Sequence, residues 1–206
     1  AVKASWQAVN ARGETAVQLA AFGGHLKVVQ ELAGEPHQSQ SQGIVVHAAR
    51  GRQVALLRTL VGDDWRLSID ERAVFDGREV SPLEQMLLDR DLDMAAALLG
   101  EFKASLPSAL FLLQLLERAD LPSAVIRLLV KHGLDVSKPL SAGRRASALH
   151  VARNVGVAEA LIELGADVKV VDGSGATALH TAAESGFVDL VRLFAVDHKL
   201  DVNARD

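Results

Sequence analysis

Apolar residues recur along this chain with the period of an α-helix, in short runs that follow glycines. Within His25–Leu32, the side chains of Val28, Val29 and Leu32 fall at positions i, i+1 and i+4, which places them on one face of a helix. The run Phe187–Phe194 has the same character. A helix this short is marginal when it stands alone in water. The pattern therefore predicts helix pairs that bury their apolar faces against further pairs of the same kind.

The segments that precede these runs repeat one another. Gly13–Gly24 and Gly175–Gly186 both follow the pattern G-x-T-x-[apolar]-x-x-A-A-x-x-G. Ser147–Ala152 is a further copy, and Ser81–Glu84, which begins Ser-Pro-Leu, is another. Self-similarity at a fixed spacing indicates a repeat protein. We count six copies, which begin near Arg12, Gln42, Asp76, Ser105, Gly143 and Gly173.

The residue types at the recurring positions suit a pair of short helices. Thr15 and Thr177 stand where the first helix begins, and their hydroxyl groups can satisfy free backbone N–H groups there. Ala20 and Ala21 are small, so a neighbouring helix can approach closely. Gly24 ends the first helix and allows the left-handed turn that leads into the second.

These motifs resemble the ankyrin repeat family, whose unit has roughly 33 residues and a T-P-L-H-x-A signature. The resemblance covers nearly the whole chain and is closest in the first and last copies. It implies an all-α fold, an ankyrin-repeat solenoid of about six stacked helix-turn-helix units with hairpin fingers. Repeats two and four are divergent. We expect residues 1–206 to form a single ankyrin-repeat domain.

Several copies depart from the repeat pattern. The fifth copy is short: about one helical turn is missing between its first helix and the second, which contains Gly156–Leu161. The second has Gly43–Ala49 in place of a Thr-Pro start. In the fourth, residues 107–118 predict a lengthened first helix, and Pro122 is expected in the first turn of the second helix. A long connection, residues 62–75, carries Trp65.

The two ends of the chain match each other. Val9–Arg12 and Val202–Arg205 share the sequence Val-Asn-Ala-Arg. In ankyrin proteins such a segment closes one repeat and opens the next, whereas a complete array ends in polar capping repeats. We therefore expect the chain to be a fragment of a longer protein. The context Leu200–Asn203 also resembles asparagine hydroxylation sites of ankyrin proteins, which makes Asn203 a candidate for that modification.

Composition narrows the function classes. Hydrophobic residues make up 49% of the chain, but there are only six Phe, two Trp and no Tyr, so the core must consist mainly of Ala, Leu and Val. A net charge of −4 argues against a strong nucleic-acid binder. The absence of cysteine excludes disulfides and thiolate chemistry. No stretch has the length and apolarity of a membrane span, and the N-terminus lacks a secretory pattern. We expect a cytoplasmic location, or the host cytosol for a secreted effector.

The histidines have two possible roles. His150 and His180 occupy the histidine of the repeat signature, where hydrogen bonding to neighbouring turns is the favoured reading over a general base or a metal ligand. The remaining histidines, at positions 25, 37, 47, 132 and 198, lack the H-x-x-x-H and H-E-x-x-H spacings of metal sites.

Other candidate motifs also favour a structural reading. Gly173–Gly175 lacks the third glycine and the lysine of a phosphate-binding loop, so it predicts a turn. Asp89, Asp91 and Asp93 lack the glycine and distal glutamate of a calcium loop. We expect no catalytic site, no metal and no cofactor.

Binding of another protein is the function that the resemblance implies. In ankyrin proteins, partners usually contact the concave side, which the fingers and first helices line. Trp65 is a further candidate because tryptophan is enriched in binding hot spots, although its ring could equally pack against its own repeat. Arg144, with Arg145, is either a contact for an acidic partner or part of a solvated turn. The positions carried over from the family pattern are Arg12, Glu14, Phe22, Arg78, Val80, Arg144, Ala146, Ser174, Ala176, Glu184 and Ser185.

Three hypotheses for function follow. The first is a non-catalytic interaction scaffold that is monomeric in isolation and binds a protein partner. The alternative is a substrate-recruiting module of a larger enzyme or bacterial effector, whose catalytic domain lies outside this chain. The third, weaker hypothesis is the sensing of a small ligand in the groove.

Overall fold

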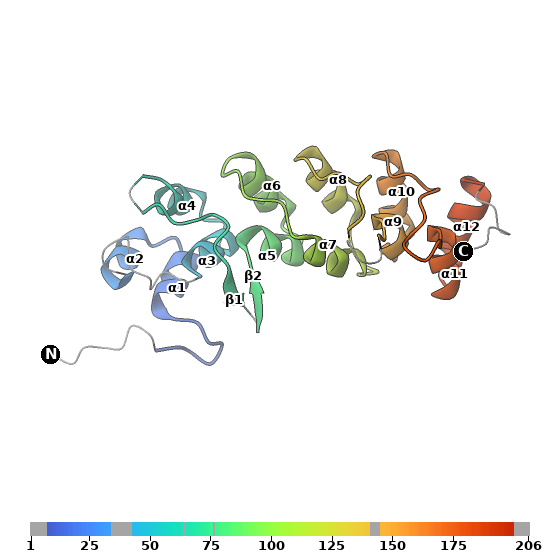
Figure 1. Cartoon of the computed structure of the whole chain (residues 1–206). Helices are drawn as coiled ribbons and strands as arrows, with labels where there is room; N and C mark the ends of the chain where they lie inside the picture. Colours follow the sequence, from blue (N-terminus) through green and yellow to red (C-terminus); the bar gives the residue numbers. More distant parts are fainter. Residues whose placement is uncertain (1–7, 34–42, 64, 76, 141–144, 200–206) are drawn as a thin grey trace. The chain divides into compact units, whose positions relative to one another are not determined.

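The computed structural model describes residues 8–33, 43–63, 65–75, 77–140 and 145–199. Apart from short hairpins, its regular elements are helices arranged in pairs (Figure 1). The chain divides into two compact units, Ala1–Ser105 (unit 1) and Leu106–Asp206 (unit 2). The expectation that residues 1–206 form a single domain stays a prediction.

Unit 1 is built from consecutive helix pairs. Helix α1 contacts α2 and α3, and α3 in turn contacts α4 and α5, so the first helices of successive repeats stack on one another. In Figure 1 the second helices α4 and α6 lie above α3 and α5. The helices are α1 (Ala16–Phe22), α2 (Leu26–Ala33), α3 (Ile44–Arg50), α4 (Val54–Val61), α5 (Pro82–Asp89) and α6 (Leu92–Gly100).

Two hairpin fingers project from unit 1. Strands β1 (Ala73–Phe75) and β2 (Arg78–Val80) pair antiparallel, with Phe75 opposite Arg78. The first repeat has a shorter finger, closed by a single bridge between Val9 and Thr15. The predicted fingers are thus present in the first and third repeats.

Unit 2 repeats this arrangement. Helix α7 contacts α9, α9 contacts α11, and α8 contacts α10, so first helices again stack on first helices and second on second. An isolated bridge between Val171 and Thr177 closes the finger that precedes α11. The elements are α7 (Ala109–Leu116), α8 (Ser123–Lys131), α9 (Ala148–Val151), α10 (Val155–Glu163), α11 (Ala178–Glu184), α12 (Val188–Arg192) and a π-helical turn, η1 (Leu193–Asp197).

Four of the described first helices, α1, α5, α9 and α11, begin with a shared capping arrangement. The N-cap hydroxyl faces the backbone N–H three residues on, and the side chain at that third position accepts a hydrogen bond from the N-cap N–H. This capping box satisfies two backbone donors that the helix leaves free. The pairs are Thr15 with Gln18, Ser81 with Glu84, Ser147 with His150, and Thr177 with His180. The predicted role of Thr15 and Thr177 is confirmed.

The core of each unit lies between its stacked layers. Leu57, Leu60 and Leu98 are completely buried in unit 1, and Leu129 and Phe194 in unit 2. The small residues Ala20, Ala21, Ala48 and Ala49 are also buried, where they allow α1 and α3 to approach closely. The sequence-based expectation of a core made of small and aliphatic side chains holds for the described residues.

The turn between the two helices of a repeat has the predicted left-handed residue. It is a glycine in two repeats and an arginine in two others. Gly24 and Gly186 have φ values of 75° and 73°, in the left-handed region. The corresponding positions of the second and third repeats carry Arg52 and Arg90, with φ values of 56° and 60°. The turn therefore has the same conformation in all four repeats, although a non-glycine residue adopts it less readily.

The fourth repeat differs from the sequence-based expectation. Helix α7 has eight residues, as α5 has, so the prediction of a lengthened first helix in residues 107–118 is wrong. Pro122 occupies the N-cap of α8, one position before the predicted first turn. The shortening of the fifth repeat is confirmed, because α9 has four residues and α11 has seven.

Candidate functional site

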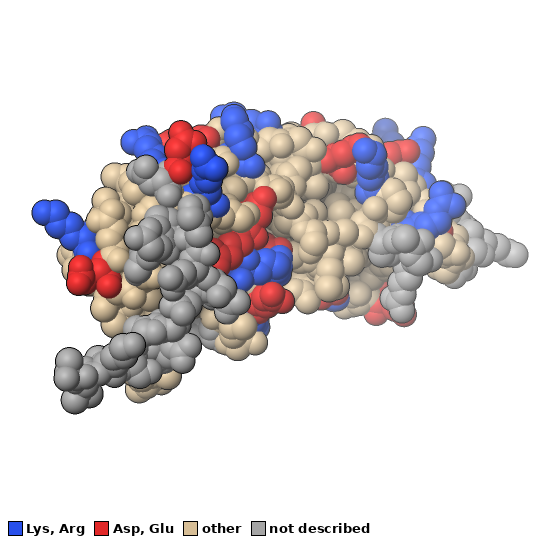
Figure 2. Space-filling view, turned by 60° about the vertical axis from the view of Figure 1, so that its left-hand side comes forward, with Lys and Arg blue, Asp and Glu red and all other residues tan. Residues whose placement is uncertain are grey.

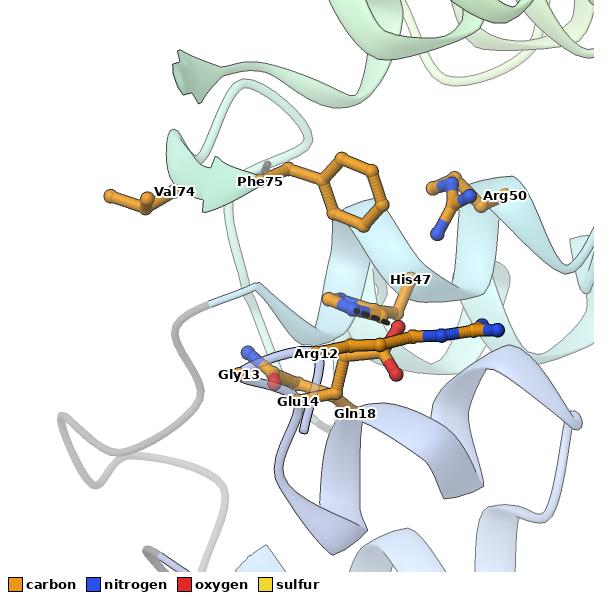
Figure 3. Close-up of a pocket in the computed structure, with 8 residues that line it drawn as sticks. All are labelled: Arg12, Gly13, Glu14, Gln18, His47, Arg50, Val74 and Phe75. Atoms are coloured by element: carbon orange, nitrogen blue, oxygen red, sulfur yellow. Dashed lines mark ion pairs between the residues drawn. The ribbon is translucent and has the colours of Figure 1, made fainter. Parts of the chain in front are cut away.

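A pocket of about 230 Å³ opens on unit 1 where the first finger, α1, α3 and β1 meet (Figure 3). Its lining combines two arginines, a carboxylate, an imidazole and an aromatic ring. The side chains that matter for its chemistry are Arg12, Glu14, Gln18, His47, Arg50 and Phe75.

The first finger holds Arg12 and Glu14 at the pocket. The side-chain carbonyl of Asn10 accepts hydrogen bonds from the backbone N–H groups of both residues, at 2.8 and 3.0 Å. The Asn10 amide also donates to the Glu14 carboxylate at 3.0 Å. Gly13, at φ 77°, supplies the left-handed residue that this tight turn requires. The finger backbone is therefore fixed by local hydrogen bonds before any partner binds.

His47 contributes a buried nitrogen without a hydrogen-bond partner among the described residues. Its side chain, on α3, is only 3% exposed. Nδ1 lies 2.7 Å from the Gly43 carbonyl oxygen, which can only accept, so Nδ1 carries the proton. Nε2 is then a bare acceptor, and it makes no hydrogen bond. The Glu14 carboxylate lies 3.9 Å from Nε2, along the dashed line in Figure 3.

The neutral form of His47 is favoured. Burial lowers the pKa of His47 below its usual 6.5, because a charged imidazolium would lose its hydration. The hydrogen bond to Gly43 and the charge of Glu14 oppose this change, whereas the charge of Arg50 reinforces it. Near pH 7 the ring therefore presents a lone pair on Nε2.

His150 and His180 make the hydrogen bonds that the repeat signature predicts. Nδ1 of His150 accepts from the Ser147 backbone N–H at 3.2 Å, and Nε2 donates to the Ala176 carbonyl at 2.9 Å. Nδ1 of His180 accepts from the Thr177 N–H at 3.1 Å. His47 thus has the opposite tautomer to His150, and it lies at a different helix position.

A cation lies between two aromatic rings beside the pocket. The guanidinium carbon of Arg50 is 4.0 Å from the centre of the Phe75 ring and 5.9 Å from that of Phe22. Nε of Arg50 also lies 3.4 Å from an Asp89 oxygen. Phe22 remains 45% exposed. We call Arg12, Glu14, Phe22, His47, Arg50 and Phe75 the finger-side patch.

The structure brings together three residues that the sequence selected. Arg12 and Glu14 line the pocket, and Phe22 joins them through Arg50. Arg78 is exposed on β2, directly opposite Phe75.

Two other candidates of unit 1 are buried. Val80 is 3% exposed and Trp65 is 4% exposed, so neither presents its side chain to a partner. For Trp65 this corresponds to the second alternative, in which the ring packs against its own part of the chain. Along β2, Arg78 and Glu79 are exposed, and only Val80, directly before the start of α5, is buried.

Candidates in unit 2 lie on its finger and on the end of α11. Ser174, Glu184 and Ser185 are exposed, and Ala176 is half-buried. Ala146 is buried, directly before the capped start of α9. Arg144 lies outside the described residues.

Sequence reasoning missed His47, Arg50 and Phe75. His47 stands four residues after Gly43, as Leu19 stands four residues after Thr15 in the first repeat, where the Leu19 side chain is exposed. Reading the second repeat in that register would have drawn attention to a histidine at a contact position. The partnership with Phe75 depends on the third finger folding back toward α3, which no local pattern encodes.

Ion pairs join successive repeats of unit 1 at its surface. Figure 2 shows acidic and basic side chains mixed over the face it presents. Arg50 with Asp89, Arg52 with Asp91 and Arg58 with Glu101 each join one repeat of unit 1 to the next. The Arg12 guanidinium forms no ion pair with the described residues, so its charge is available to a ligand.

Metal-binding clusters and membrane-spanning helices are both absent from the described residues. They contain no group of three or more His, Asp or Glu side chains placed to bind a metal. None of their helices combines the length and apolarity needed to cross a bilayer.

Comparison with known proteins identifies the fold. Residues 112–206 match the family model for ankyrin repeats, with three copies. No curated protein sequence matches the chain. The human ASB11 ankyrin repeat domain has 19% identity and a TM-score of 0.65, over 94% of this chain and 87% of that one. The ankyrin repeat domain of Bcl-3, described as a unique member of the IkappaB protein family, has 20% identity and a TM-score of 0.63, over 91% and 86%. Residues 112–206 are therefore ankyrin repeats by sequence, and the chain has the all-α fold of an ankyrin repeat domain, as its motifs predicted.

Proposed function

We propose that this chain is a non-catalytic interaction module that binds another protein through the finger-side patch of unit 1. Ankyrin repeat domains generally mediate interactions between proteins. The observation that carries the proposal is the arrangement of Phe22, Arg50 and Phe75, with Arg12, which forms no ion pair in the described part of the chain, beside them.

The residue types of the patch are those that dominate binding energies. Aromatic and arginine side chains are enriched among hot spots, because each combines a large contact area with directional interactions. Phe22 is a large apolar side chain that is nearly half exposed in the free protein. Covering it would remove apolar surface from water, which favours association.

Preorganisation supports the same conclusion. The first finger is fixed by the hydrogen bonds of Asn10, and Arg50 is held by Phe75 and Asp89. A partner that binds here orders few side chains, and the entropy lost on association is correspondingly small. In unit 2, the exposed Ser174, Glu184 and Ser185 are proposed as additional contacts.

The proposal predicts a selective loss of binding. Full-length protein carrying Arg12→Ala and Phe22→Ala is expected to lose partners that the wild type captures from a lysate of its source organism. The matched control carries Lys27→Ala and Val28→Ala, which removes one exposed cation and one exposed apolar side chain from α2. The control is expected to retain the same partners, identified by quantitative mass spectrometry.

Two outcomes would contradict the proposal. Equal capture by the wild type and the Arg12/Phe22 variant would remove the finger-side patch as the binding surface. Loss of partners in the Lys27/Val28 control alone would move the interface to the second helices. A cytoplasmic location and a monomeric state in isolation complete the proposal, and fractionation and light scattering measure them.

A further inference from the structure

We propose that the pocket around His47 receives a primary carboxamide, the side chain of an Asn or Gln on the bound partner. This inference rests on the proposed function, since the pocket belongs to the finger-side patch. It adds the chemistry by which one partner residue is recognised.

Two acceptors in the pocket require a ligand with two donors. Nε2 of His47 carries a lone pair and has no hydrogen-bond partner among the residues that the structure describes. The nearer Glu14 oxygen lies 3.9 Å away, and the other Glu14 oxygen is already bound by Asn10. One NH₂ group can donate to two acceptors at this separation with hydrogen bonds of roughly 2.9 Å that are bent but acceptable. Leaving a buried acceptor unpaired is unfavourable, so filling it contributes to affinity.

The third contact comes from Arg12. Its guanidinium lines the same pocket, is exposed, and makes no ion pair with the described residues. It can donate to the carbonyl oxygen of the amide whose NH₂ group faces His47 and Glu14. A carboxamide therefore matches the pocket at both of its polar ends.

Other side-chain chemistries fit less well. A carboxylate would place its charge against two acceptors, His47 Nε2 and Glu14, with no hydrogen to donate. An ammonium group would satisfy those acceptors but would meet the positive charges of Arg12 and Arg50. A carboxamide carries no net charge and offers both donors and an acceptor.

The pocket walls suit a small planar group. The Phe75 ring lies edge-on to the His47 ring, with the ring centres 5.7 Å apart, and forms the upper side of the pocket in Figure 3. Gln18 is already engaged, because its side-chain oxygen accepts from the Thr15 N–H. His47 Nε2 is shielded from solvent, so a neighbouring side chain must shift before the amide reaches it.

Protonation gives the recognition a pH dependence. When His47 gains a proton, Nε2 becomes a donor and can no longer accept from the amide. The charged groups beside the ring are Arg12 and Glu14 on the finger and Arg50 on α3. Glu71 accepts a hydrogen bond from the backbone N–H of Gly43, the residue whose carbonyl accepts from His47 Nδ1. Burial raises the pKa of Glu71, so its charge also falls on acidification. Affinity for the amide is expected to drop as pH falls through the pKa of His47.

A displayed library of random peptides tests the inference. The library is selected on the full chain and, in parallel, on the His47→Asn variant, whose amide can still donate to Gly43 but which has no Nε2. The expected result is an Asn or Gln enriched at one position in the wild-type pool only. A synthetic peptide from that pool is expected to bind about tenfold more weakly when its Asn is replaced by Asp or Leu. A loss of this size corresponds to about one hydrogen bond.

Matched variants separate this inference from the proposed function. Arg12→Gln is expected to weaken the same peptide several-fold, whereas Lys131→Gln and His132→Asn, at the end of α8 in unit 2, leave its affinity unchanged. Two outcomes would overturn the carboxamide inference and leave the proposed function standing. In both, the selected peptides depend on Arg12 and Phe22 for binding. They either show no preference for Asn or Gln, or bind the His47→Asn variant as tightly as the wild type. Enrichment of Lys or of Asp would overturn the carboxamide inference likewise. A library that yields no binder to either protein would count against both proposals.

Discussion

At the residue scale, two histidines of this chain illustrate how local hydrogen bonding determines chemistry. His150 accepts through Nδ1 from a helix N-cap and donates through Nε2 to the next finger, so both nitrogens are used. His47 donates through Nδ1 to Gly43, and no described residue forms a hydrogen bond with its Nε2. A side chain of the first kind stabilises the stack, and one of the second kind is available to a ligand.

The state of His47 predicts how stability depends on pH. Its pKa in the folded protein is lowered relative to the unfolded value near 6.5, so the unfolded chain binds more protons between those two values. The free energy of unfolding therefore rises with pH through this window and is lowest on its acidic side. Urea denaturation between pH 5 and 8, compared with His47→Asn, measures the effect. A wild-type slope that the variant fully retains would assign the dependence to other groups, such as Glu71.

At the element scale, the helices could be predicted because their signals are local. Thr15 and Thr177 mark the N-termini of helices, and Gly24 and Gly186 follow their C-termini. Each signal lies within one short segment of the sequence. The second repeat lacks these signals, since Gly43 offers no side chain to cap α3. Its helix nevertheless forms, buried between α1 and α5, which shows that tertiary packing outweighs local propensity there.

The candidate site was only partly predictable, because some of its residues meet only through the packing of successive repeats. Arg12, Glu14 and Phe22 belong to one repeat, and the family pattern selects them. His47 and Phe75 come from the second repeat and the third finger, and their meeting depends on how successive repeats stack. Burial of Trp65 and Val80 likewise follows from packing that the sequence pattern does not specify.

Close contact between helix ends makes one glycine indispensable. A Cβ at Gly51 would overlap the backbone carbonyl of Phe22, where the end of α3 meets the end of α1. Gly51→Ala is expected to lower the free energy of unfolding by about 1–3 kcal/mol, because backbone must shift. Gly156→Ala, inside α10, meets only an Asn154 oxygen at 3.7 Å and should stabilise the chain by about 0.5–1 kcal/mol. Chemical denaturation measures the free energy of unfolding of both variants. Equal stabilities of the two variants would contradict the close approach of Gly51 to the Phe22 backbone.

At the scale of the whole molecule, repetition supplies stability and divergence supplies recognition. Within each unit, stacked layers bury aliphatic side chains that no single helix pair could cover. Ion pairs such as Arg52 with Asp91 join adjacent repeats at the surface, where each adds little on its own. The residues that differ most between repeats, including His47 and Arg50, are those that give the finger-side patch its chemistry.

Site-specific photo-crosslinking tests the central claim most directly. A photoreactive amino acid is placed at position 22 in one protein and at position 28 in another, since both native side chains are about equally exposed, at 45% and 46%. Position 22 belongs to the finger-side patch, and position 28 lies on α2. Covalent capture of the partner from position 22 and not from position 28 is the predicted result. Capture from position 28 alone would contradict the proposed binding surface.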